Sequence, residues 1–259
     1  MKQIIKNSDQ IAGIRKSSAI VGEILRTIGR EITAGMKTKD LEDIAVSIIK
    51  KYNAKSAFYH YGGKRNPYPG QICISVNDEV VHGIPGEKVI RDGDIVSVDV
   101  GVVLDGYYGD AARTFVIGDI SERTKELIST TQEALSVAVS LCNESNTLRD
   151  ISLAIYKTAQ DKKIGVVRDL VGHGVGLELH EPPQIPNFVI GGPTIRLRKG
   201  MVLAIEPMFT EGDYRVTYDR HDGWTVRTMD GSLSAHFENT ILVGEEHGEI
   251  LTKAEDDGK

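Results

Sequence analysis

The chain has 259 residues, of which 40% are hydrophobic and 26% charged, a composition typical of a soluble globular protein. Its net charge of −6, from 31 basic and 37 acidic residues, argues against specific binding of nucleic acid through a basic surface. Only two cysteines occur, so no disulfide framework is expected and a reducing, cytoplasmic location is indicated. The N-terminus lacks the apolar core of a signal peptide, and no apolar run approaches the ~18 residues of a membrane span.

Four helices are predicted in chain order. Ser8 is expected to cap the first, which runs to about residue 29, and Thr38 the second. Ser121 is expected to cap the third, and the fourth is expected to begin at about Thr147. After residue 164 the pattern is typical of strands and loops, so the chain is predicted to combine helices and strands in an α+β fold.

A strand, turn, strand pattern around Asp105 predicts a β-hairpin, because Asp-Gly suits the positive φ angles of a two-residue type I′ turn. In that register Asp99 faces Ala112, and Gly101 faces Asp110. The two aspartates then share one face as diagonal neighbours, with Cβ atoms roughly 7 Å apart or less. Gly101 leaves the space opposite Asp110 empty. The hairpin therefore predicts two carboxylates held close together.

Two such carboxylates repel each other unless a positive charge lies between them. The alternative is that one is buried by hydrogen bonds of the turn and the other is solvated. Three later segments bear on this choice. A glycine-rich segment holds His173 and His180, Glu206 ends a strand, and Glu238 lies in the middle of an apolar strand with no Lys or Arg nearby. Taken singly, each has a plain structural explanation, a tight turn for the histidine or a wet strand face for the glutamates.

Together these segments supply four carboxylates and one imidazole, with a charge of −4 before any cation binds: Asp99, Asp110, His173, Glu206 and Glu238. Two divalent ions would neutralise that charge. Oxygen-rich ligation favours Mn, Fe or Co over a zinc–thiolate site. Two ions ~3.5–4 Å apart can deprotonate a bridging water and polarise a carbonyl, so the pattern indicates metal-assisted hydrolysis.

The chain also contains a weak internal repeat. Two stretches recur at one shared offset of 107 residues (198 minus 91): 41–48 with 148–155, and 91–99 with 198–206. The repeat aligns Asp99 with Glu206, so a fold with two related halves would bring both acids to a common centre.

Five short motifs occur in a fixed order: Val-His-Gly-Ile-Pro (81–85), Val-Asp-Val-Gly to Tyr-Gly-Asp (98–110), Gly-His-Gly-Val-Gly (172–176), Ile-Glu-Pro-Met (205–208) and Phe-Glu-Asn-Thr (237–240). In these motifs the chain resembles the type I methionine aminopeptidases of peptidase family M24 over nearly its whole length. The resemblance implies one catalytic domain, residues 1–259, with the α+β pita-bread fold. Two pseudo-twofold halves, about 1–116 and 117–259, would share a central antiparallel sheet covered by helices.

The implied activity is removal of the N-terminal methionine from nascent proteins and peptides whose second residue is small. Two divalent ions, Co, Mn, Fe or Zn, would hold the attacking water. By resemblance, Asp99 chelates one ion, Asp110 and Glu238 bridge both, and His173 and Glu206 complete the other. Glu206 would also carry the proton as general base and acid.

The resemblance assigns His82 and His180 to the scissile amide and the tetrahedral intermediate. Their alternatives are an ordinary loop histidine and an ordinary strand-edge histidine. The pocket for the methionine side chain would be apolar, with soft or aromatic walls, and is assigned to Tyr68, Cys73, Leu179 and Trp224. Trp224 could instead be a core anchor.

A monovalent cation is implied near Asn77, Glu79 and Ser234. Two residues depart from the family pattern. Asn239 stands where histidine is usual, and Leu179 stands where an aromatic residue is common. Neither departure removes a metal ligand. The effect of Asn239 on turnover and the effect of Leu179 on the shape of the methionine pocket stay open.

Two other functions are weighed. A prolidase-like enzyme would share the fold, yet such enzymes usually carry a large extra N-terminal domain, and only 98 residues precede Asp99. A metal-free binding module on the ribosome or on nascent chains should have lost ligands, whereas this chain keeps all five. The expected partner is the N-terminal methionine of nascent polypeptides, acted on by a monomer that binds no nucleic acid or membrane. Contact with the ribosome stays open.

Overall fold

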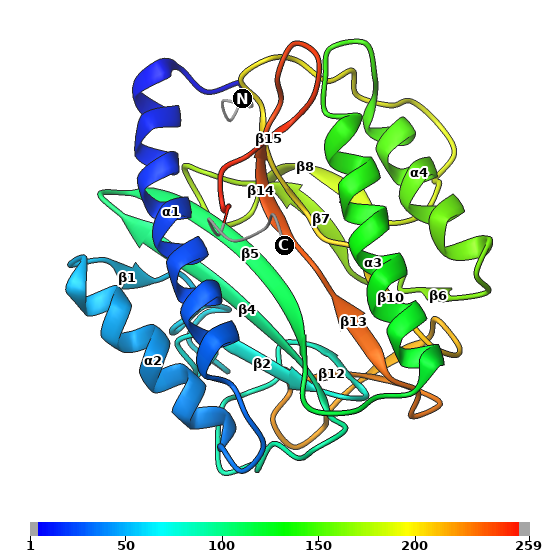
Figure 1. The fold of residues 1–259 in the computed structure, drawn as a ribbon. Helices are drawn as coiled ribbons and strands as arrows, with labels where there is room; N and C mark the ends of the chain where they lie inside the picture. The colour runs from blue at the N-terminus through cyan, green and yellow to red at the C-terminus, as the bar shows by residue number, and fades with distance from the viewer. Residues whose placement is uncertain (1–4, 254–259) are drawn as a thin grey trace.

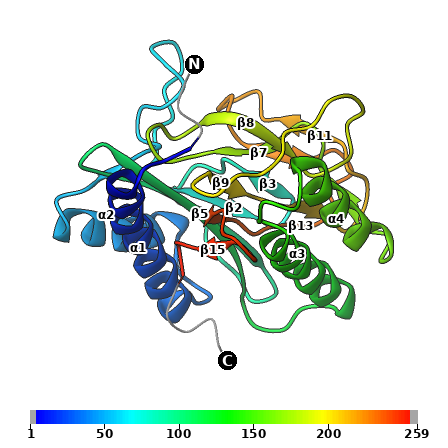
Figure 2. The same ribbon diagram turned by 90° about the horizontal axis from the view of Figure 1, so that it is seen from above.

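The computed structural model describes residues 5–253, in which four helices lie as two pairs over one side of the β-strands (Figure 1). The helices are α1 (Ser8–Glu31), α2 (Thr38–Lys51), α3 (Glu122–Ser140) and α4 (Leu148–Gln160). A view turned by 90° shows all four on the same side of the strands (Figure 2). No helix among the described residues is both long and apolar enough to cross a bilayer.

The helix ends confirm one of the three predicted caps, Ser121, and the predicted start of the fourth helix near Thr147. Ser121 and Thr147 cap α3 and α4, each accepting a hydrogen bond from the backbone three residues later. The cap of α1 is Asn7 rather than Ser8, because the Asn7 side chain accepts from the backbone of the third helical residue. Thr38 is the first residue of α2 rather than its cap. Both errors are of one residue.

The strands form four antiparallel sheets, ordered β1-β4-β2 with β5 also paired to β4, β15-β14-β9-β7-β8, β13-β10-β6, and β11-β12-β3. Their bounds are β1 Lys55–Ser56, β2 Cys73–Val76, β3 Glu79–Val81, β4 Ile95–Leu104, β5 Tyr107–Val116, β6 Gly165–Val166, β7 Val171–Gly174, β8 Glu181–Pro186, β9 Val202–Ile205, β10 Met208–Thr210, β11 Val216–Tyr218, β12 Val226–Thr228, β13 Ser234–His236, β14 Asn239–Leu242 and β15 Glu249–Ile250.

The predicted hairpin is confirmed. β4 and β5 pair in the expected register, with Asp99 opposite Ala112 and Gly101 opposite Asp110. Asp105 has φ +53° and the glycine after it +82°, as a type I′ turn requires. The space opposite Asp110 is not empty, however. A Cβ atom on Gly101 would lie 2.5 Å from the ring of Phe58, so an aromatic side chain fills it.

Glu238 does not lie in the middle of a strand, as the sequence had indicated. It lies in a break between β13 and β14, which belong to different sheets. Its backbone still pairs with β5, because Glu238 N donates to Ala112 O at 2.8 Å and Ala112 N donates back at 3.3 Å. The break therefore connects two sheets at the residue that carries the acidic side chain, Glu238.

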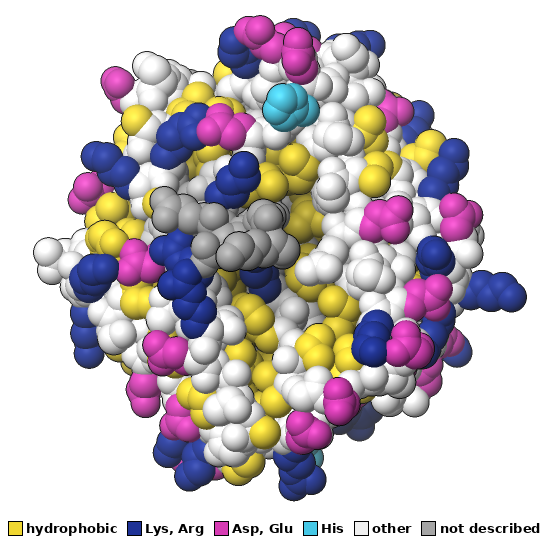
Figure 3. Space-filling view, viewed as in Figure 1, with side chains coloured by type: hydrophobic (Ala, Val, Ile, Leu, Met, Phe, Trp, Pro, Cys, Tyr) yellow, Lys and Arg dark blue, Asp and Glu magenta, His cyan; other side chains and the backbone are white. Residues whose placement is uncertain are grey.

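Each helix pair covers its own apolar core. The α1 and α2 side buries Ile24, Ile28 and Leu41 against strand residues that include Val98 and Val100. The α3 and α4 side buries a second cluster with Leu127, Ile151, Ile155, Ile205 and Phe209. Hydrophobic side chains also gather between the two pairs on the helix-bearing surface (Figure 3). Burial of these stripes explains why the amphipathic helices lie on one side and leave the other side of the strands to the site.

Candidate active site

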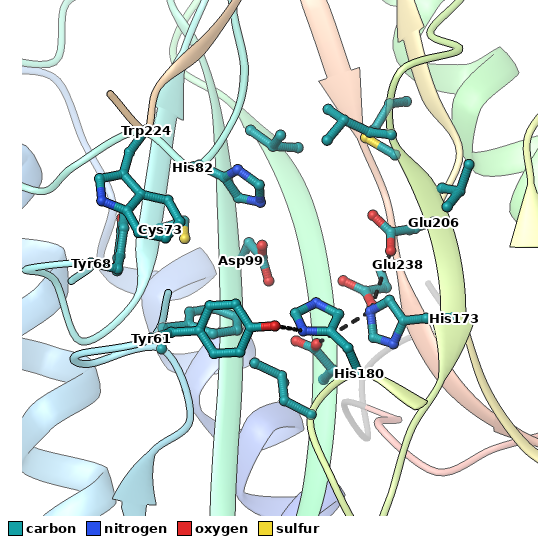
Figure 4. A pocket seen from close by; sticks show the side chains of 17 residues that line it. Tyr61, Tyr68, Cys73, His82, Asp99, His173, His180, Glu206, Trp224 and Glu238 are labelled. Atoms are coloured by element: carbon teal, nitrogen blue, oxygen red, sulfur yellow. Dashed lines mark hydrogen bonds and ion pairs between the residues drawn. The ribbon is translucent and has the colours of Figure 1, made fainter. Parts of the chain in front are cut away.

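A pocket lies on the side of the strands away from the helices, and Figure 4 shows it with the helices behind. Alternation along β5 explains the direction of Asp110. Its neighbour Gly109 packs against Ser18 of α1, where a Cβ atom would come within 2.6 Å of the backbone. The next side chain must therefore point to the opposite side. The cavity holds about 150 Å³, enough for several waters or one side chain.

Five side chains predicted from the sequence meet in this pocket, and we call them the carboxylate cluster: Asp99, Asp110, His173, Glu206 and Glu238. His173 Nε2 lies 3.5 Å from Glu206 Oε1 and 3.9 Å from Asp110 Oδ2. Ligand atoms of Asp110, His173 and Glu238 all lie within 4.8 Å of one another. The spacing suits donors converging on a cation.

The glycines around His173 are required by close backbone packing rather than by a tight turn. His173 lies on β7, paired with β8 and β9. A Cβ atom on Gly172 would lie 2.5 Å from Ala204 O, and one on Gly174 would lie 2.3 Å from Pro182 O. Only glycine lets the three strands approach this closely while the imidazole points into the pocket.

Burial makes the carboxylate cluster costly to charge. It raises the pKa of Asp99 to about 7 and of Glu206 to about 8, and it raises the pKa values of Asp110 and Glu238 well above the usual range. Burial lowers the pKa of His173 to about 3, so this ring is neutral at pH 7. The contact of His173 with Glu206 is therefore not an ion pair.

Buried oxygens without partners test whether the cluster suits a metal. Asp99 Oδ1, Asp110 Oδ1 and Glu238 Oε1 are buried and have no hydrogen-bond partner among the described residues. Unpaired buried carboxylate oxygens are unfavourable unless a cation coordinates them. Four carboxyl groups and a neutral imidazole form a donor set suited to divalent ions with oxygen and nitrogen ligands. Asp110 is buried, and Asp99 is half-buried and lines the pocket beside it, so the two aspartates do not lie apart as in the alternative.

Loops supply the other side of the pocket, which we call the loop wall: Tyr61, Tyr68, His82, Leu179, His180 and Trp224. His82 has φ +59° and lies 6.2 Å from the Trp224 ring, and burial lowers its pKa to about 4. The His180 ring lies edge-on to His173 at 4.3 Å. Its pKa is also lowered by burial.

The four residues predicted for the methionine side chain lie together. Tyr68, Cys73 and Leu179 form one buried apolar cluster with Phe58, and Trp224 packs against it. The Tyr68 and Trp224 rings meet edge to face at 5.3 Å. Burial raises the pKa of the Cys73 thiol, which keeps it protonated and apolar in character. Trp224 thus lines the pocket rather than anchoring a separate core.

The residues expected near a monovalent cation are also adjacent. Ser234 N donates to the carbonyl of Asn77 at 2.9 Å. The Glu79 carboxylate is already paired with Arg227 Nη2 at 2.8 Å and with Lys88. Any cation there would therefore rely on backbone carbonyls rather than on this carboxylate.

Sequence reasoning missed three residues of the site. Phe58 fills the space beside Gly101, and Tyr61 Oη lies 2.7 Å from His180 Nδ1. His236 is only 1% exposed, and its Nε2 lies 3.6 Å from Glu206 Oε2. Its position two residues before Glu238 in an alternating pattern was a usable signal. Phe58 and Tyr61 lie in irregular segments, which carry no periodic signal.

Comparison with known proteins places this geometry in a family. Metallopeptidase family M24 matches residues 12–245. The methionine aminopeptidase of Clostridium acetobutylicum is 47% identical over 97% of this chain and 99% of its own, and methionine aminopeptidase 1 of Bacillus subtilis is 43% identical over 96% and 99%.

Solved structures of other proteins support the same family assignment. The crystal structure of a methionine aminopeptidase from Thermotoga maritima has a TM-score of 0.93 and 48% identity, covering 98% of this chain and all of that one. A prolidase from Pyrococcus horikoshii has a TM-score of 0.76 and 25% identity, with 98% of this chain and 65% of the prolidase covered. The α+β pita-bread fold expected from the sequence is thus confirmed. The chain belongs to metallopeptidase family M24, whose enzymes are metal-dependent hydrolases, and within it to the methionine aminopeptidases.

Proposed function

We propose that the protein removes the N-terminal methionine from nascent proteins and peptides whose second residue is small. The observation that carries the proposal is the carboxylate cluster, in which three buried carboxylate oxygens have no hydrogen-bond partner among the described residues, beside an apolar cavity. An apolar cavity next to a metal site suits one unbranched hydrophobic side chain at the end of a peptide. A narrow site beyond the scissile bond would select against large second residues.

The carboxylate cluster would hold two divalent ions drawn from Mn, Fe, Co or Zn. Asp99 would chelate one ion, Asp110 and Glu238 would bridge both, and His173 and Glu206 would complete the other. Two ions rather than one would balance the four negative charges of the ionised cluster. Ions held there would lower the pKa of water and polarise the scissile carbonyl.

The chain's own residues would handle the substrate and the proton. Glu206 would accept a proton from the attacking water and return it to the leaving amine. It lies between His173 and His236, which limits the directions its carboxyl group can face. His82 and His180, on the loop wall, would hold the scissile amide and stabilise the negative oxygen that forms.

The methionine side chain would enter the apolar pocket. Tyr68, Cys73, Leu179 and Trp224 would surround it with polarizable and aromatic groups, which favour contact with a thioether. Leu179 stands where an aromatic residue is common, so this wall would be softer and the pocket differently shaped. Holding the flexible methionine side chain in one conformation would cost conformational entropy. Removing the apolar surface of the side chain and of the pocket from water would offset that cost.

Several wider features complete the proposal. The two halves, about 1–116 and 117–259, would act as one catalytic domain, and the enzyme would work as a monomer because one chain supplies the whole site. Both cysteines are unpaired and buried, which suits a cytoplasmic location. Nascent chains emerge at the ribosome, so contact with it belongs to the proposal. A monovalent cation would bind near Asn77, Glu79 and Ser234.

Release of free methionine tests the proposal. Met-Gly, Leu-Gly and Met-Pro peptides are incubated with the purified protein, with the chelated protein, and after adding back Mn, Fe, Co or Zn. We expect release from Met-Gly but not Leu-Gly, loss on chelation, and recovery with at least one metal. Cleavage that ignores the first residue but requires proline second would instead indicate a prolidase-like enzyme. No release with any metal from a folded protein would reject both enzymes.

A further inference from the structure

Tyr61 lies in the loop wall and contacts the proposed catalytic machinery through a single hydrogen bond. Its hydroxyl oxygen is 2.7 Å from Nδ1 of His180, although the two residues are 119 positions apart in sequence. The two rings lie with centroids 5.0 Å apart at an interplanar angle of 57° (Figure 4). The contact is a hydrogen bond between tilted rings rather than a ring stack.

The backbone holds Tyr61 in place even though 43% of the residue is exposed. Tyr61 N donates to Phe58 O at 2.8 Å, and Tyr68 N donates to Tyr61 O at 2.8 Å. The next residue, Gly62, packs so closely on Trp224 that a Cβ atom would lie 2.5 Å from the indole. The phenol is therefore delivered to His180 by a fixed turn.

The direction of the hydrogen bond depends on the tautomer of His180, because the phenol can donate to Nδ1 or accept from it. Burial and the nearby acidic groups raise the pKa of Tyr61, so its hydroxyl keeps a proton to donate. A neutral imidazole has one donor and one acceptor nitrogen, and the partner of one nitrogen decides the role of the other. If Nδ1 accepts from the phenol, Nε2 carries the N–H. That N–H then faces the pocket, where the carbonyl oxygen of a bound substrate would accept it.

We propose that Tyr61 is a positioning residue, which donates to His180 Nδ1 and so sets the tautomer in which Nε2–H is presented to the substrate carbonyl oxygen. The inference rests on the proposed function, in which His180 stabilises the developing oxyanion. Without the phenol, either nitrogen of His180 could carry the proton, and the ring could turn. Only the fraction with Nε2–H directed at the substrate would then stabilise the transition state.

Nuclear magnetic resonance of the metal-free, full-length protein tests the tautomer directly. Ring ¹⁵N signals of His180 are assigned by their loss in His180→Ala. We expect a protonated Nε2 in the original protein and a mixture of tautomers in Tyr61→Phe. Tyr59→Phe is the matched control, because Tyr59 lies in the same segment, is 47% exposed and stacks on His60 instead. A protonated Nδ1 in the original protein would overturn the inference.

Kinetics of the metal-loaded protein test the consequence. We expect Tyr61→Phe to lower kcat for Met-Gly release about tenfold, as for the loss of one hydrogen bond, with KM changed less than about twofold. In a His180→Ala background, Tyr61→Phe should cause no further loss, because its effect passes through His180. Two results would overturn the inference. One is that Tyr61→Phe lowers kcat as much in the His180→Ala background as it does alone. The other is that Tyr61→Phe alone lowers kcat no more than Tyr59→Phe does.

Failure of the inference is distinguishable from failure of the proposed function. An original protein that releases no methionine rejects the function, while the nuclear magnetic resonance result still decides the tautomer. An active protein in which His180→Ala keeps full activity rejects the role of His180, and with it the catalytic part of the inference. An active protein that loses activity in His180→Ala but not in Tyr61→Phe rejects the role of Tyr61 alone.

Discussion

The carboxylate cluster and the loop wall face each other across one pocket but are built differently. Strands and strand ends supply the cluster, and its carboxyl groups keep buried oxygens without hydrogen-bond partners among the described residues. The loop wall comes from irregular segments, where hydrogen bonds join His180 to Tyr61 and the Tyr68 hydroxyl to Gly83 O at 2.8 Å, although the buried Trp224 Nε1 has no partner among the described residues. Rigid strands hold charges together that would otherwise separate, while loops place neutral groups by hydrogen bonds. The cluster should therefore depend on a cation for stability, and the loop wall should not.

The largest effect is expected for Asp110→Asn. Removing a carboxylate that we propose bridges both ions should weaken metal binding at least about 100-fold and lower methionine release about 1000-fold. The metal-free variant should nevertheless melt a few degrees higher than the original protein at pH 8, because one repelling charge is gone. Calorimetric titration with Mn and thermal melts measure both. Asp105→Asn, in the turn of the same hairpin, is the control and should change neither. A variant that binds metal normally would refute the assignment of Asp110 as a ligand.

His82→Ala should separate the two sides of the pocket. We expect kcat to fall about 100-fold, as for loss of a group that stabilises an oxyanion, while metal affinity changes less than about twofold. Steady-state kinetics and the same titration provide the measurement. His247→Ala, at an exposed histidine, is the matched control. Loss of metal binding in His82→Ala would mean that the loop wall and the cluster are not separable.

The pH dependence of stability should measure how unfavourable it is to ionise the buried carboxyl groups of the carboxylate cluster. Folding raises the pKa values of Asp99 and Glu206 to about 7 and about 8 from 3.8 and 4.5, so between these limits the folded state binds more protons than the unfolded state. Their stabilising contribution is thus complete below about pH 4 and is lost as the pH rises toward 8. The metal-free melting temperature should fall between pH 7 and 8.5, above the range in which the buried histidines, whose pKa values are lowered from 6.5, make stability rise with pH.

Excess Mn should remove or reverse this fall, because the ion replaces the protons. Scanning calorimetry with and without metal measures the difference. In Asp110→Asn the metal-free fall should be smaller, since that variant has one fewer acidic group to deprotonate. A metal-free melting temperature that rises steadily over this pH range would contradict the expected sign.

The smallest effect is expected for Asn239→His, which restores the residue common in the family. Asn239 lines a groove on the helix side of the strands with Leu135 and Ile250, not the pocket, and its Oδ1 accepts from Thr252 Oγ1 at 2.9 Å. We expect kcat/KM to change less than about threefold. Thr252→Val, which removes this hydrogen bond and the one that Thr240 N donates to Thr252 Oγ1 at 3.2 Å, should cost about 1–2 kcal/mol of stability without changing the rate. A tenfold rate change in Asn239→His would show that this position acts through Glu238.

The hairpin shows what local rules are able to predict. The turn residues and strand alternation placed Asp99 and Asp110 on one face, and the structure has that register. Glu238 shows their limit. Its apolar surroundings predicted a continuous strand, but the chain there passes from one sheet to another. A strand pattern records which side chains are buried, not which strand each residue pairs with.

The sequence by itself determined the helices, the hairpin and the choice of the five side chains that meet in the pocket, because periodicity, turn chemistry and short motifs are local properties. Tertiary structure alone decided which neutral groups complete the site. Phe58 filled the space beside Gly101, His236 came to lie against Glu206, and Tyr61 met His180 across 119 residues. These contacts form where long loops close over packed cores. The free energy of loop closure varies only slowly with loop length, so loop length does not select the partners. Packing and hydrogen bonding between distant segments therefore select the partners, which no local pattern specifies.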